Sequence, residues 1–99
     1  MIDHIVLLRP RAEATEAQID ALREGILGLR TQLPGIVDLV WGANVSREQL
    51  DQGYLLGFVV QFVDASARDE YLPHPAHAAI VPQVHAVADQ VLVFDLDRS

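Results

Sequence analysis

The sequence predicts one α+β domain in which helices cover a single antiparallel sheet. Its 99 residues suffice for one hydrophobic core and are too few for two. Strand-like and helix-like patterns follow in the order strand, helix, strand, strand, helix, strand, which is the split βαβ, ferredoxin-like order. Two predicted strands are apolar on both faces, whereas helices can cover only one face. We therefore expect a second copy to cover the other face in a closed two-fold dimer.

The first predicted strand covers residues 2–8, Ile-Asp-His-Ile-Val-Leu-Leu. This segment is rich in β-branched and apolar residues, and it stops at Arg9-Pro10 because proline cannot donate to a strand ladder. Side chains alternate along a strand, so one face carries Ile2, His4, Val6 and Leu8. The opposite face carries Asp3, Ile5 and Leu7, and it is therefore also mainly apolar.

The next segment has the pattern of an amphipathic helix. Thr15 and Gln18 form a capping box at its start, and Pro34-Gly35 follows its end. Between these signals, apolar residues recur at helical spacing at Ile19, Leu22, Ile26, Leu29 and Leu33. The opposite side of this helix is charged, and we expect it to face solvent.

Two further strands are predicted in the middle of the chain. Residues 36–44 are rich in Val and contain Trp41, residues 44–53 form a polar connection, and residues 54–63 form the next strand. In this last strand one face carries Leu56, Phe58, Val60 and Phe62, and the other face is also apolar.

A short helix is predicted after the third strand. Asp64-Ala-Ser66 opens it, Ser66 and Asp69 are its predicted cap pair, and it ends at Tyr71.

The rest of the chain predicts a second helical segment and a final strand. Pro73 and Pro75 break the preceding helix, and a helix resumes near Ala76. Pro82 is expected to divide or kink it. The last strand covers residues 90–96.

Composition excludes several classes of function. The formal net charge is −7 and the basic residues are seven dispersed Arg, so the clustered positive charge that binds nucleic acid is absent. The absence of Cys excludes disulfides, thiolate metal sites and a cysteine nucleophile, and it fits a reducing compartment. The N-terminus does not resemble a secretory leader, and the most apolar stretch, residues 55–63, is too short to span a bilayer. We therefore expect a cytoplasmic protein that binds neither nucleic acid nor membranes.

Histidine and tyrosine are the candidates for chemistry. Tyr71 and His77 flank the predicted helix break, where both can bring a polar group to the rim of an apolar cavity. A neutral imidazole is a base and a phenol donates to a carbonyl oxygen, so this pair suits enolate chemistry. His4 lies on an apolar strand face, where an imidazole is either a hydrogen-bonded core residue or a third group at the same cavity. His74 and His85 are expected to be structural or exposed.

Other catalytic machinery is not evident in the sequence. His74 and His77 stand three residues apart without a carboxylate or a third ligand, which is a weak zinc pattern. Asp95 and Asp97 alternate with Leu96, and we interpret them as surface charges and not as a catalytic carboxylate pair. A Gly-rich phosphate loop and a Gly-x-Ser-x-Gly nucleophile elbow are both missing.

Four segments form a recognisable combination: His4-Ile-Val-Leu-Leu8, Trp41-Gly42-x-Asn44-Val45, Gly53-Tyr54 and, above all, Tyr71-Leu-Pro-His-Pro-Ala-His77. In this combination the sequence resembles the stress-responsive dimeric α/β-barrel (Dabb) family, from residue 2 to about residue 96. The resemblance implies a homodimer in which two four-stranded sheets form an α/β barrel.

Within this family the sequence is similar to plant polyketide cyclases. That likeness implies a cofactor-independent intramolecular aldol or Claisen-type condensation of a poly-β-ketone. In it, His77 would be the general base, Tyr71 would polarise the substrate carbonyl, and His4 would support the hydrogen-bond network. The residues expected to line the substrate cavity are Val6, Leu8, Leu22, Ile26, Leu56 and Val91.

The resemblance also implies a cation site, and two alternative functions stay open. Some relatives hold a cation such as Mg²⁺ on backbone carbonyls, which would correspond here to Arg30, Leu33 and Ile36. The main alternative function is non-catalytic ligand binding or a structural role. A blocked pocket, or a His77 bonded to a carboxylate with no solvent path, would favour it. The other is a haem or quinol monooxygenase, but the sequence offers no constellation of ligands for it.

Overall fold

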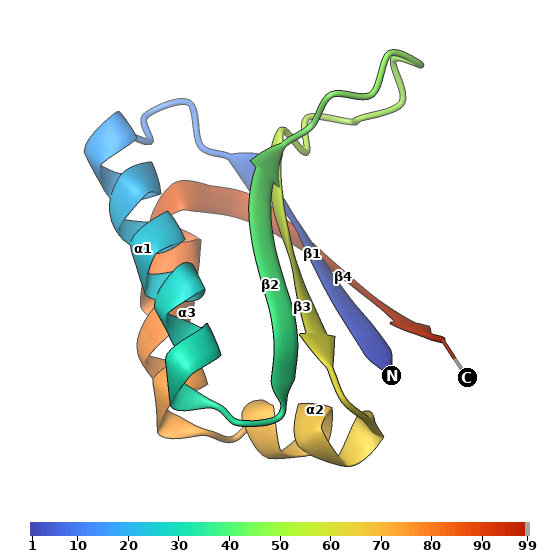
Figure 1. The fold of residues 1–99 in the computed structure, drawn as a ribbon. Coiled ribbons are helices and arrows are strands. Elements are labelled where there is room, and N and C mark those ends of the chain that lie inside the picture. The colour runs from blue at the N-terminus through green and yellow to red at the C-terminus, as the bar shows by residue number, and fades with distance from the viewer. Residues whose placement is uncertain (99) are drawn as a thin grey trace.

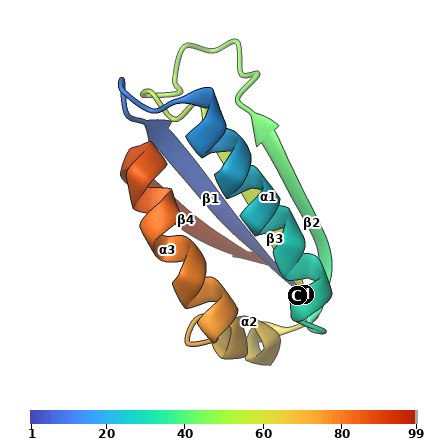
Figure 2. The same cartoon turned by 90° about the vertical axis from the view of Figure 1, so that its left-hand side faces the viewer.

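The computed structural model describes residues 1–98; Ser99, the last residue of the predicted single domain, lies outside them. Its elements are β1 (Ile2–Pro10), α1 (Glu16–Gln32), β2 (Ile36–Ala43), β3 (Leu56–Phe62), α2 (Ala65–Tyr71), α3 (Pro75–Val87) and β4 (Ala88–Asp97). The strands form one antiparallel sheet in the order β2-β3-β1-β4. Helices α1 and α3 cover one face, and α2 lies at one end (Figures 1 and 2). The predicted α+β, ferredoxin-like fold is confirmed.

The core forms between the sheet and the helices, as the hydrophobic pattern predicts. On β1, the four side chains of the predicted inner face are all buried: Ile2, His4, Val6 and Leu8. They pack with the buried face of α1, which carries Leu22, Ile26 and Leu29. The predicted capping box at the start of α1 is also confirmed. Thr15 Oγ1 accepts from the Gln18 N–H at 3.1 Å, and the Gln18 side chain accepts from the Thr15 N–H at 3.0 Å.

The start of α2 differs from the prediction. Asp64 is the cap residue, and its carboxylate accepts a hydrogen bond from the Ala67 N–H at 2.8 Å. The predicted pair of Ser66 and Asp69 is wrong, because the helix already begins at Ala65 and Ser66 lies inside its first turn. The aspartate that precedes Ser66 offers the same capping chemistry two residues earlier.

Helix α3 also differs, because it continues through Pro82 as one segment from Pro75 to Val87. Proline has no N–H to donate to the carbonyl of Ala78, four residues earlier. Both residues are exposed. Water can therefore solvate this carbonyl, and the helix is not divided.

The sheet face away from the helices is apolar and exposed. We call this surface the open face. It carries Ile5, Leu7, Val40, Val59, Leu92, Phe94 and Leu96. Phe94 is 58% exposed and Val40 is 52% exposed. This arrangement agrees with the prediction that the sheet is apolar on both faces. Among residues 1–98, no helix is both long and apolar enough to cross a membrane.

Candidate active site

A pocket of about 260 Å³ lies on the helix-covered side of the sheet. Strands β1 and β4 form one part of its wall, and α3 with the C-terminal end of α2 forms another. The three predicted catalytic residues, His4, Tyr71 and His77, all line it, and so does His85. Apart from these side chains the wall is made of aliphatic residues and Phe58, so the pocket is an apolar space with a few polar groups.

The break between α2 and α3 brings Tyr71 and His77 together. Pro75 disfavours a helical conformation at His74, which is extended with φ −64° and ψ 138°. His74 also caps α3, because its Nδ1 accepts from the Ala76 N–H at 3.0 Å. Tyr71 ends α2 and His77 lies in the first turn of α3. Their ring centroids are 4.5 Å apart.

The hydrogen bond of His77 defines which of its nitrogens can act as a base. Nδ1 lies 2.9 Å from the carbonyl oxygen of Leu72. A carbonyl oxygen can only accept, so Nδ1 carries the proton of this bond. In the neutral ring Nε2 then holds a free lone pair and can accept a proton from a substrate. The side chain is half-buried, so it is not sealed inside the core.

Tyr71 is a buried phenol that stays protonated. The residue is 2% exposed, and burial raises the pKa of its hydroxyl to about 12. Within residues 1–98, no hydrogen bond involves this hydroxyl, and no fully buried side-chain oxygen or nitrogen lacks a partner. The hydroxyl oxygen therefore reaches accessible space, where it can donate a hydrogen bond to a ligand.

The raised pKa of Tyr71 can be measured directly. The chain has two tyrosines, so Tyr54→Phe leaves Tyr71 as the single phenol. We expect the phenolate absorbance of this folded variant to have its midpoint near pH 12, compared with 10.0 for the ordinary value. Burial favours the neutral phenol, so this contribution to stability is complete below pH 10 and is lost as the pH rises towards 12. A native midpoint near 10, equal to that in denaturant, would contradict the burial of the Tyr71 side chain.

His4 is held by a carboxylate that the sequence interpretation placed on the surface. Asp95 on β4 lies directly opposite His4 on β1, and its Oδ1 is 2.6 Å from His4 Nδ1. Its other oxygen accepts from Arg68 on α2 at 3.0 Å. Because a carboxylate accepts, His4 Nδ1 carries the proton of this bond, and in the neutral ring Nε2 keeps a lone pair. The His4 ring packs edge-on against Tyr71, with centroids 5.7 Å apart.

The predicted lining residues fall into two groups. Val6, Ile26 and Val91 lie on the pocket wall. Leu8 and Leu22 are fully buried core residues, and Leu56 lies outside this pocket, at the root of the β2–β3 connection. The sequence interpretation missed seven further lining residues, namely Phe58, Leu72, Ile80, Val81, Val84, His85 and Val93. Helix α3 is apolar on most sides, so periodicity does not identify the face that lines a pocket.

A metal site has little support from side chains. Nowhere in the described chain do three or more His, Cys, Asp or Glu residues gather in a way that could hold a metal ion. The predicted carbonyl site lies at the C-terminal end of α1, at Arg30, Leu33 and Ile36. The Leu33 carbonyl there already accepts the N–H of Ile36 at 3.1 Å. It keeps a second lone pair for a cation, so the cation site stays a prediction.

Comparison with known proteins identifies the family. Residues 2–97 match the profile of the Stress responsive A/B Barrel Domain, Dabb. The chain belongs to this family. The match covers all seven elements of the fold and every residue of the pocket. The resemblance inferred from the sequence motifs is therefore confirmed.

Three similar proteins illustrate how far the likeness extends. Olivetolic acid cyclase from Cannabis sativa is 27% identical over 94 residues, covering 95% of this chain and 93% of that protein. The stress-response A/B barrel domain-containing protein HS1 from Arabidopsis thaliana is 31% identical over 94 residues, covering 95% and 86%. A dimeric ferredoxin-like protein of unknown function from Jannaschia is 32% identical, covers 97% of each chain and superimposes with a TM-score of 0.87.

Proposed function

We propose that this Dabb protein binds a small, largely apolar carbonyl compound in its helix-covered pocket and catalyses its intramolecular aldol or Claisen-type cyclisation. The observation that carries the proposal is the pair of rings 4.5 Å apart on the pocket wall, a protonated phenol and an imidazole with a free Nε2. The 27% identity to olivetolic acid cyclase supports the reaction class. It does not identify the substrate.

The proposed chemistry needs one base and one hydrogen-bond donor. His77 Nε2 takes a proton from a carbon that lies between two carbonyl groups, and the C–H electron pair forms an enolate. The Tyr71 hydroxyl donates to the enolate oxygen and stabilises its developing charge. In the aldol reaction the enolate carbon attacks a ketone carbon further along the same chain, which closes the ring, and the new alkoxide takes the proton back from the His77 imidazolium. In the Claisen-type reaction the attacked carbon is the thioester carbonyl, so the C–S bond breaks and the departing thiolate takes that proton.

His4 is proposed to support this pair rather than to replace it. Asp95 on β4, itself held by Arg68 on α2, fixes the ring, and the edge of the ring packs against Tyr71. A fixed neighbour reduces the freedom of the phenol and keeps its hydroxyl at the pocket. His77, by contrast, bonds to a backbone carbonyl. A bond to a carboxylate would instead favour a purely structural His77.

The size of the pocket favours a second candidate function, ligand binding without catalysis. The pocket measures about 260 Å³, slightly below the roughly 300–1,000 Å³ of typical ligand sites. A short ligand fits this volume. Binding of a ketone without any acceleration of its cyclisation would support this second candidate.

The assay that tests the catalytic proposal uses a linear tetraketide thioester. We expect the purified protein to give a cyclic product faster than buffer does, with a product ratio different from that of spontaneous cyclisation. Protein kept unfolded in denaturant serves as the blank. Products and rates equal to those in buffer would reject the proposal for this substrate class.

We also propose that the chain acts as a homodimer joined through the open face. Large exposed side chains such as Phe94 and Val40 leave this face apolar in the single protomer. A relative with 32% identity is described as dimeric. Two sheets packed face to face would bury both surfaces.

A further inference from the structure

The connection between β2 and β3 contains the most exposed apolar side chains of the described chain. We call residues 44–55 the β2–β3 arm. In it Val45 is 85% exposed and Leu50 is 69% exposed, more than any other large apolar residue among residues 1–98. Figure 1 shows the arm projecting beyond the end of the sheet, on the side away from the helices. Val45 lines a hollow together with Leu7 and Val40, and Leu50 lines one together with Leu7 and Leu92. Both exposed side chains of the arm therefore lie on the same side as the open face.

The arm has a defined shape and is not a loose polar loop. At its root the Asn44 side chain donates to the Tyr54 carbonyl at 2.9 Å, and the Asn44 N–H donates to the Leu55 carbonyl at 2.8 Å. Nearer its tip, Asp51 accepts from the N–H groups of Gly53 and Tyr54, at 2.8 and 2.9 Å. These bonds fix the arm internally.

The backbone of the arm supports the same conclusion. Gln49 and Gln52 adopt positive φ angles of 61° and 52°. A residue with a Cβ is disfavoured there by roughly 1–2 kcal/mol. Such conformations persist only where the surrounding structure fixes them. The arm therefore has a defined backbone conformation, in which Val45 and Leu50 are both exposed.

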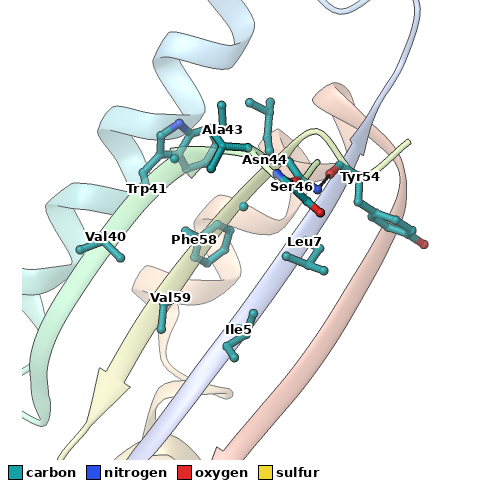
Figure 3. A pocket seen from close by; sticks show the side chains of 14 residues that line it. Ile5, Leu7, Val40, Trp41, Ala43, Asn44, Ser46, Tyr54, Phe58 and Val59 are labelled. Atoms are coloured by element: carbon teal, nitrogen blue, oxygen red, sulfur yellow. Dashed lines mark hydrogen bonds between the residues drawn. The ribbon is translucent and has the colours of Figure 1, made fainter. Parts of the chain in front are cut away.

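The open face next to the arm has a depression that fits side chains from another molecule. Gly42 on β2 lies opposite Gly57 on β3, and a Cβ at Gly42 would meet nothing within 4 Å. A hollow of about 430 Å³ results beside the root of the arm. Figure 3 shows Ile5, Leu7 and Val59 standing along this hollow, with Asn44 bonded to Tyr54 at its edge.

The far end of the open face is polar and already satisfied. Asp3 accepts from Arg98 at 2.6 Å and from Gln61 at 3.0 Å, and these bonds hold the pKa of its carboxyl below the usual range. This end offers charges to solvent. The exposed apolar part of the open face therefore lies between this polar cluster and the arm.

We infer that the β2–β3 arm of each protomer packs Val45 and Leu50 on the open apolar face of a second copy. This inference rests on the proposed homodimer and adds the segment that holds the two copies together. One chain supplies both an apolar arm and an apolar face on the same side, which makes the surface self-complementary. In a two-fold dimer every such contact occurs twice, so a second copy of this chain fits it better than a single unrelated ligand.

The test compares dimer dissociation constants by sedimentation over a range of concentrations. We expect the wild type to have about twice the 10.9 kDa mass of one chain. In the double variant Val45→Ser, Leu50→Ser we expect the dimer dissociation constant to rise by at least about 100-fold, because each substitution removes a contact from both copies. Leu27→Ser is the matched control, because Leu27 is a 41% exposed leucine on α1. It should change the constant by less than about threefold.

A third variant separates failure of the arm from failure of the dimer. Phe94→Asp places a charge in the open face and should give monomers. If wild type is monomeric, both the homodimer and the arm contact are rejected. If Phe94→Asp dissociates the dimer but the arm variant does not, the homodimer stands and the arm inference is overturned. Far-ultraviolet circular dichroism should show that the arm variant remains folded, because both replaced side chains are already exposed in the protomer.

A second measurement tests contact directly. The chain contains no cysteine, so Leu50→Cys provides a unique site for a photoreactive label. In a dimer of isotopically heavy and light chains, we expect crosslinks from position 50 to open-face peptides of the other copy. Crosslinks confined to the labelled chain itself would overturn the inference.

Discussion

His77→Ala should reduce cyclisation of a linear poly-β-ketone by about 10²–10⁴-fold, the usual contribution of a positioned general base. The substitution removes the only ring nitrogen proposed to take the substrate proton. It should leave the fold intact, because His77 is half-buried and its bond to the Leu72 carbonyl is solvent-accessible. The measurement is the rate of product formation under saturating substrate, together with thermal unfolding of both proteins.

A neighbouring histidine supplies the matched control. His74 belongs to the same Pro-rich segment but does not line the pocket; it caps α3. Asparagine is an equally good cap, so His74→Asn should retain both stability and activity. Added imidazole should restore part of the activity of His77→Ala. Full activity in His77→Ala would show that the base is another group, with His4 as the next candidate.

Local sequence signals predicted those parts of the fold that depend on near neighbours. Thr15 and Gln18 are three residues apart, so their capping box could be identified from spacing alone, and it is present. The pair Pro73 and Pro75 predicted the helix break that places Tyr71 beside His77. The cap of α2 was misassigned because Asp64 and Ser66 both offer a suitable oxygen, and spacing does not decide between them.

The least predictable part of the site depends on strand register. His4 and Asp95 are 91 residues apart in sequence, and they meet only because β1 and β4 pair with one particular alignment. A shift of one residue would turn Asp95 to the opposite face. Without this register an aspartate near the chain end is reasonably taken as a surface charge. The cavity is likewise a product of packing, since Leu22 and Ile26 share a helix face but only Ile26 reaches the pocket.

Tyr71→Phe separates the role of the phenol oxygen from that of its ring. The ring packs against His4, Phe62 and His77, and phenylalanine keeps these contacts. The hydroxyl makes no hydrogen bond to another residue within the described chain. Its loss should therefore change the free energy of unfolding by no more than about 0.5 kcal/mol.

Activity should respond very differently to the same substitution. Removing one donor to a developing oxyanion lowers turnover by about 10²–10³-fold, and the raised pKa of Tyr71 keeps this donor protonated throughout the neutral range. Turnover and thermal unfolding measured on the same preparation decide between the outcomes. A stable but slow Tyr71→Phe would support the donor role, because a residue that acts only through packing is unaffected by losing its hydroxyl. An unchanged rate would assign carbonyl polarisation to another group, and a large loss of stability would show that the hydroxyl is a structural element of the pocket.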